Sequence, residues 1–247
     1  MPNQLAVVAL DHASYLHWGR GARDAADFFF YRVYLRKAGG GTALLGETDS
    51  EGFLDLLAQN GLTYSYLVSA VDDQGHESAG TAVVRSTPRP DYHGEWLYDW
   101  FDKPASSGFR FRTSDQDQAV VSGSDASRHF RLETDAGGWW LVPGPTADVY
   151  PQAWSTTALK CGVGADSDCA DVIRAPTSGY VHEDLGLIPQ STYVLRVRGD
   201  VGQNHYGALR VTLLGTDQNG LAIMIFDWAY QLQPGSPDLA PRSAPVR

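Results

Sequence analysis

The sequence has few cysteines, few lysines and no long apolar run. Two of its 247 residues are cysteine, and Lys37, Lys103 and Lys160 are the only lysines. With a net charge of −10 it offers no row of cations for a phosphate backbone, which excludes a nucleic-acid partner. No segment reaches the roughly 18–20 apolar residues of a membrane-spanning helix, so we expect no transmembrane segment.

The usual catalytic motifs are missing as well. The sequence contains no G-x-S-x-G, no H-E-x-x-H and no G-x-x-x-x-G-K-[ST], and no Ser-His-Asp set can be identified. Nothing marks Glu133, Asp135 or Asp227 as members of a catalytic carboxylate pair. We therefore expect no catalytic residues, no cofactor and no enzymatic activity.

The two cysteines, Cys161 and Cys169, lie in the segment "CGVGADSDC". No histidine lies within ten residues to complete a zinc site, and the spacing is not C-x-x-C. A disulfide across this short loop, worth about 2–3 kcal/mol, is the first interpretation, and two free thiols are the alternative. The nearby acids Asp166, Asp168 and Asp171 do not follow the EF-hand pattern, so we expect them to be solvated and predict no metal site.

A disulfide predicts an oxidising, extracytoplasmic compartment, either a periplasm or a cell surface. The first residues show neither a basic region nor an apolar stretch, so no signal peptide is visible in the sequence.

Period-two alternation dominates the first ninety residues. It is clear in "YRVYLRK" (31–37) and in "TYSYLVSAV" (63–71), and turn-forming clusters such as "KAGGG" and "DDQG" separate these segments. Short strands at this spacing indicate a β-sandwich.

These segments, together with "SYLHWGRG" and "GLTYSYLVSAVDDQGHESAGTAVVRSTPRP", resemble a fibronectin type III domain over about residues 4–88. The resemblance implies an immunoglobulin-like sandwich over residues 1–90. It also implies that Trp18 fills the space between the two sheets and that the Tyr64 hydroxyl ties a corner to nearby backbone. Such a domain is a spacer or binding module without a catalytic site.

Residues 91–107 follow two prolines, Pro88 and Pro90, and are predicted to be an aromatic linker. Their aromatic side chains either pack the two domains together or form an exposed platform for a sugar, a protein partner or a membrane surface. The candidate interaction residues here and in the next domain are Tyr92, Trp96, Tyr98, Trp100, Phe101, Trp139 and Trp140.

Residues 108–232 are predicted to form a second antiparallel β-sandwich, or a related all-β fold, without a recognisable helix. The segment "HFRLETDAGGWWLV" predicts a hairpin with strands at 129–133 and 139–142. The strand near 221–232 carries apolar residues on both sides, so we expect it to be central and covered on both faces. One side holds Met224, Phe226, Trp228, Tyr230 and Leu232, and the other holds Leu221, Ile223 and Ile225.

The segments "SGFRF", "TYVLRV", "HYGALRVTLLG" and "IFDWAYQLQPG" are similar to HmuY-type haem-binding proteins of bacterial envelopes. The chain has no position that aligns with the haem-ligand histidines of that family. A haem or metal site would need other side chains to converge, and the alternative is that the histidines lie on surfaces or in turns. The candidates are His129, His182, His205 and Met224.

The Pro-rich tail, residues 233–247, is expected to dock on its own domain or on another subunit. Together these features predict a non-enzymatic extracytoplasmic accessory protein, a structural subunit that docks on a larger membrane-associated protein assembly. The alternative is an envelope protein that binds haem or carbohydrate through the second domain, with the sugar contacted by Trp96, Trp100, Trp139 and Trp140.

Overall fold

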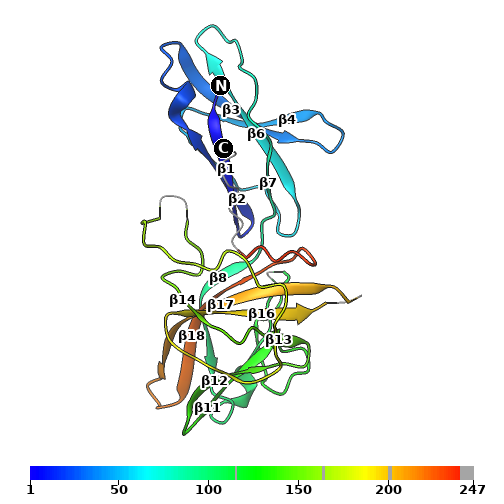
Figure 1. Ribbon diagram of the computed structural model, residues 1–247, viewed down its shortest axis with the longest axis vertical. Coiled ribbons are helices and arrows are strands. Elements are labelled where there is room, and N and C mark those ends of the chain that lie inside the picture. The colour runs from blue at the N-terminus through cyan, green and yellow to red at the C-terminus, as the bar shows by residue number, and fades with distance from the viewer. Residues whose placement is uncertain (115, 163–164, 200–201, 240–247) are drawn as a thin grey trace. The chain divides into compact units, whose positions relative to one another are not determined.

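The computed structural model describes residues 1–114, 116–162, 165–199 and 202–239. Figure 1 shows an all-β chain whose described part falls into two compact units, residues 1–89 and 90–239. The strands pair antiparallel throughout, and helical structure in the described part is limited to the 3-10 turns η1 (Arg20–Ala22) and η2 (Pro104–Ser106). No described helix is long and apolar enough to span a membrane.

Two sheets make up the first unit. One has the order β1 (Asn3–Leu10), β2 (Ala13–Gly19), β5 (Gly52–Asp55). The other has the order β4 (Thr42–Thr48), β3 (Phe28–Arg36), β6 (Tyr64–Asp72), β7 (Val84–Ser86).

The core of the first unit lies between these sheets. Trp18 of β2 is buried and meets the ring of Tyr31 on β3 edge-on, with ring centroids 5.2 Å apart. The Tyr64 hydroxyl accepts a hydrogen bond of 3.0 Å from the Gln59 backbone N–H. Both side chains lie as the resemblance implied, and the unit is a sandwich of the fibronectin type III kind.

The second unit also consists of two sheets. One has the order β10 (Val120–Val121), β9 (Gly108–Phe109), β11 (Phe130–Asp135), β12 (Gly138–Pro143), β15 (Leu185–Gly186). The other has the order β13 (Ala147–Val149), β16 (Ser191–Arg198), β17 (Asn204–Thr216), β18 (Ala222–Tyr230), β8 (Asp91–Tyr98), with β14 (Trp154–Ser155) paired to β16. The hairpin of β11 and β12 confirms the predicted one.

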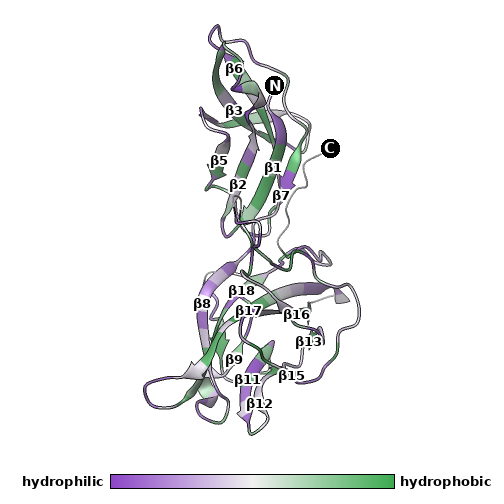
Figure 2. Ribbon diagram, turned by 60° about the vertical axis from the view of Figure 1, so that its left-hand side comes forward, coloured by the Kyte–Doolittle hydropathy of each residue, from purple (hydrophilic) through white to green (hydrophobic). Residues whose placement is uncertain are grey.

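The two sheets of the second unit enclose an aromatic core. Phe109 meets Phe130, Phe226 and Trp228 with ring centroids 5.0 to 5.6 Å apart. All four rings are fully buried, so this core joins strands from both sheets. Figure 2 shows hydrophobic segments on strands of each unit, as on β1, and hydrophilic segments on other strands, as on β8 and β11.

The prediction of a linker over residues 91–107 is wrong for its first half. Residues 91–98 form β8, which pairs with β18 and ends the larger sheet of the second unit. Leu97 is fully buried opposite Met224, whereas Trp96 and Tyr98 lie on the other face of the strand. The closely spaced aromatic residues of this segment therefore lie on the alternating faces of a strand and do not form a connection between domains.

β18 is an interior strand, but its two faces are not equally covered. Met224, Phe226 and Trp228 are fully buried in the core. Ile223 and Ile225 on the other face are only half-buried, so the expectation of cover on both faces fails at this end of the strand.

Elsewhere the outer face of the larger sheet is covered by loops. Leu159, Val172 and Ala175 pack against Val194 and Ala208, and all five are buried. The Leu239 N–H donates to the Ile173 carbonyl, and the Ala175 N–H donates to the Pro237 carbonyl. The described part of the Pro-rich tail, 233–239, thus lies on its own unit, and residues 240–247 lie outside the described residues.

Candidate functional site

An apolar strip runs across the uncovered part of the larger sheet, and we name it the β8 face. Trp96 pairs with Ile225, Tyr98 pairs with Ile223, and Leu213 also pairs with Ile225, so these side chains share one side of the sheet. Trp96 is 55% exposed and Leu213 is 44% exposed, while the other three are half-buried. The β8 face consists of Trp96, Tyr98, Leu213, Ile223 and Ile225.

The rim of the β8 face is mainly acidic. The Tyr98 hydroxyl points to the Asp217 carboxylate at 3.4 Å, and the Asp102 carboxylate accepts the Ala222 N–H at 2.8 Å. Burial acts to raise the pKa of Asp217, but hydrogen bonds from the Asn219 and Leu221 N–H groups outweigh it and hold this pKa below its usual value. The Lys103 ammonium lies 4.2 Å from the centre of the Tyr98 ring.

The remaining predicted interaction aromatics are dispersed. Phe101, just beyond β8, is 69% exposed. Tyr92 stacks on Trp228, with ring centroids 6.3 Å apart. Trp100 is half-buried against the Arg131 guanidinium, 4.8 Å from its ring centre.

The four tryptophans of the carbohydrate hypothesis do not form one surface. Trp139 packs against the core, and Trp140 points away from it and donates from Nε1 to Asp135 at 2.8 Å. Both belong to β12, in the sheet opposite the one that carries Trp96. A sugar platform that uses all four at once is therefore wrong for this fold.

The four candidate haem ligands do not converge on one site either. Met224 is fully buried in the core, and the His182 side chain is 54% exposed with Nδ1 at 3.0 Å from the Ala147 carbonyl. Only His129 and His205 meet, at a cleft of the second unit.

This cleft has a volume of about 400 Å³ and lies at one end of the sandwich. The end of β16, the start of β17 and the end of β18 meet the segments after β9 and before β11 there. Its lining residues are Arg110, Phe111, Thr113, Asp117, His129, Val197, Arg198, Gly199, His205 and Tyr230.

His129 is only 8% exposed, and its Nδ1 accepts the Phe111 N–H at 3.1 Å. This bond places the ring proton on Nε2, which makes that atom a donor. Burial, followed by the charges of Arg110 and His205, lowers the pKa of His129 to about 4. The ring is therefore neutral at neutral pH, and its Nε2 offers no lone pair to a metal or to haem iron.

His205 has the opposite tautomer. Its Nδ1 lies 3.0 Å from the Gln231 carbonyl and donates to it, which leaves the lone pair on Nε2. Tyr230 is 4% exposed and stacks parallel to Phe111 at 4.9 Å, and burial raises the pKa of its hydroxyl. In the described part of the chain no group of three or more His, Cys, Asp or Glu side chains could hold a metal ion.

The sequence singled out two residues of this cleft and missed the others. His129 and His205 were candidates because of their residue type. Tyr230 was predicted only as one of several apolar positions along a strand, and Phe111 and Arg110 carried no signal. Their approach depends on how the ends of the two sheets meet, which a linear pattern does not encode.

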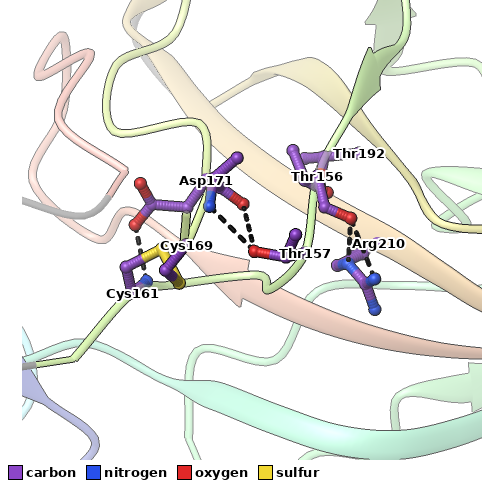
Figure 3. The surroundings of a disulfide bond; sticks show 8 residues. Thr156, Thr157, Cys161, Cys169, Asp171, Thr192 and Arg210 are labelled. Carbon is purple, nitrogen blue, oxygen red and sulfur yellow. Dashed lines mark hydrogen bonds between the residues drawn. A yellow bond between two sulfur atoms is a disulfide. The ribbon is translucent and has the colours of Figure 1, made fainter. Parts of the chain in front are cut away.

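The predicted disulfide between Cys161 and Cys169 is confirmed, with an S–S distance of 2.09 Å. Figure 3 shows it beside the Asp171 carboxylate, which accepts the Cys161 N–H at 2.6 Å. Asp171 is thus engaged in the loop rather than merely solvated, whereas Asp166 and Asp168 are exposed.

No protein-family model and no curated protein matches the chain. Among solved structures, an Fn3-like protein from Clostridium thermocellum has 26% identity, covers 36% of this chain and 92% of its own, and has a TM-score of 0.30. The fibronectin type III domain of human fibronectin type III domain containing protein 3 has 19% identity. The match covers 36% of this chain and 85% of that domain, with a TM-score of 0.30.

The family 28 exopolygalacturonase of Yersinia enterocolitica has 19% identity, covers 36% of this chain and 21% of its own, and has a TM-score of 0.30. These likenesses are too partial to bear on function, and the activity in this name belongs to that enzyme alone.

Proposed function

We propose that the chain is a non-enzymatic extracytoplasmic accessory protein, a structural subunit that docks on a larger membrane-associated protein assembly. The observation that carries this proposal is the β8 face, where five apolar side chains lie in register on a sheet and two of them are exposed. Contiguous exposed apolar strips are typical of sites that another protein covers.

The rim indicates the kind of partner. Asp102 and Asp217 border the β8 face, and the chain as a whole has a net charge of −10. A protein surface with an apolar centre and a basic border would complement this arrangement, because opposite charges at a rim raise the association rate and fix the orientation. The disulfide supports the extracytoplasmic location, since such bonds persist in oxidising compartments.

Site-specific photo-crosslinking in the source organism tests the proposal. A photoreactive residue in place of Leu213 should give one discrete crosslinked product, and one in place of the exposed Ala136 on the β11–β12 turn should not. The added substitution Trp96→Asp should reduce the Leu213 product at least tenfold without changing the thermal unfolding of the purified protein, because Trp96 is largely exposed. Equal products from Leu213 and Ala136, or none from either, would refute the proposal.

A further inference from the structure

Two buried donors open onto the cleft of the second unit. The Tyr230 hydroxyl and the His129 Nε2–H have no hydrogen-bond partner among the described residues, and neither is among the polar atoms sealed from solvent. Both donors are therefore open to the cleft, where an acceptor group of a ligand that reaches both can take the place of water.

The third polar group of the floor, the His205 ring, requires a hydrogen-bond donor rather than an acceptor. The His205 Nδ1–H is engaged with the Gln231 carbonyl, so its Nε2 is an acceptor. The ring centroids of His205 and Tyr230 lie 5.7 Å apart, and the ring centroids of His129 and Tyr230 lie 6.1 Å apart. One small molecule that carries an acceptor next to a donor can therefore reach all three groups.

The charges at the cleft favour a single negative charge. Among the described residues, the guanidinium groups of Arg110 and Arg198 and the carboxylate of Asp117 line it. Arg198 is paired with the Asp148 carboxylate at 3.7 Å, whereas the hydrogen bonds of Arg110 go to neutral groups, the Ser127 hydroxyl and the Gln118 carbonyl. Hydrogen bonds, first from Thr113 and then from Ser114, hold the pKa of Asp117 below its usual value, and burial raises it only weakly. The Asp117 carboxylate therefore remains charged. Arg110 is therefore the cation that can meet a ligand carboxylate, while the charge of Asp117 disfavours the second negative charge of a dianion such as phosphate.

Apolar walls complete the cleft. Phe111, stacked on Tyr230, and Val197 offer carbon surface to the body of a ligand. We infer that this cleft binds a small hydroxylated carboxylate, such as a sugar acid. Its carboxylate accepts from Tyr230, His129 and Arg110, and a neighbouring hydroxyl donates to the His205 Nε2.

The test uses the full chain and three probes, D-gluconate, D-glycerate and L-lactate. Addition of at least one of them should shift the ring-nitrogen NMR signals of His129 and His205 and leave those of the exposed His182 unchanged. D-glucose lacks the carboxylate and propanoate lacks the hydroxyl, so each should bind at least tenfold more weakly than the best probe.

Variants separate the cleft from the rest of the molecule. Tyr230→Phe keeps the stack on Phe111 and removes the hydroxyl, so the affinity for the best probe should fall about tenfold with little change in thermal unfolding. His182→Gln and Trp96→Asp should bind it like the wild type, because neither residue lines the cleft.

Two results would overturn the inference. One is the absence of any shift at His129 and His205 with all three probes at millimolar concentration. The other is unchanged affinity in Tyr230→Phe. Failure of the crosslinking at Leu213 would leave this result untouched, since the β8 face and the cleft share no residue.

Discussion

At the scale of single residues, the Tyr64 hydroxyl holds the corner before β6 through the Gln59 N–H. Tyr64→Phe removes this acceptor, so the free energy of unfolding of the first unit should fall by about 1 kcal/mol in urea titrations. Tyr15→Phe is a matched control, because the Tyr15 hydroxyl has no hydrogen-bond partner among the described residues. Equal losses in the two variants would contradict the role of the corner.

His129 should make stability depend on pH. Its pKa is lowered from 6.5 to about 4 in the fold, mainly by burial, so between these values the unfolded chain binds more protons than the folded one. The contribution of the neutral His129 ring to the free energy of unfolding is fully present above pH 6.5. It is lost as the pH falls towards 4, by about 3 kcal/mol in total.

Denaturant titrations of wild type and His129→Gln between pH 7 and pH 4 check this. The glutamine variant is less stable at pH 7 but should lose less stability on acidification, because it carries no titrating ring. Parallel pH profiles for the two proteins would show that His129 is not the group responsible.

Single residues also mark the limit of prediction from sequence. Trp18 and Tyr64 were placed correctly, because their roles depend on neighbours within their own unit's strand pattern. Tyr230 looked like any other apolar position of its strand, since nothing in a linear pattern shows that Phe111 and His129, from the segments next to β9 and β11, approach it. Residues that meet across a sandwich end are invisible to periodicity.

At the scale of elements, the disulfide loop covers part of the larger sheet of the second unit. Leu159 and Val172, on either side of the bridge, pack on Val194 of β16. The double variant Cys161→Ser/Cys169→Ser should lower the free energy of unfolding of the second unit by about 2–3 kcal/mol, because the unfolded chain gains freedom.

Calorimetry of the double variant, with reduced wild type beside it, measures this loss. The two should agree, since both lack the same crosslink. An unchanged melting temperature in both would mean that the bridge contributes no stability to this loop.

The strands themselves were mostly predictable, and β8 shows why one was not. The β11–β12 hairpin has regular alternation around a glycine-containing turn, and its position was predicted correctly. In β8 the aromatic residues on both faces hid the alternation, and the prolines before it suggested a boundary. Only its pairing with β18, more than 120 residues later in the chain, identifies it as a strand.

At the scale of the whole molecule, the first unit has a core of its own. Trp18, Tyr31, Val33, Tyr66 and Val68 are all buried within it. We expect a chain of residues 1–89 to fold alone and to unfold cooperatively in urea, as its single tryptophan, Trp18, would report by fluorescence. A gradual, non-cooperative change would show that this core is insufficient by itself.

The central claim is that a partner protein covers the β8 face. Hydroxyl-radical footprinting measures this directly in two samples, the purified chain and the native preparation of the source organism. Trp96 should be oxidised at least fivefold less in the native preparation, whereas Phe29, which is 63% exposed on β3, should react equally in both. Equal oxidation of Trp96 in the two samples would contradict the account.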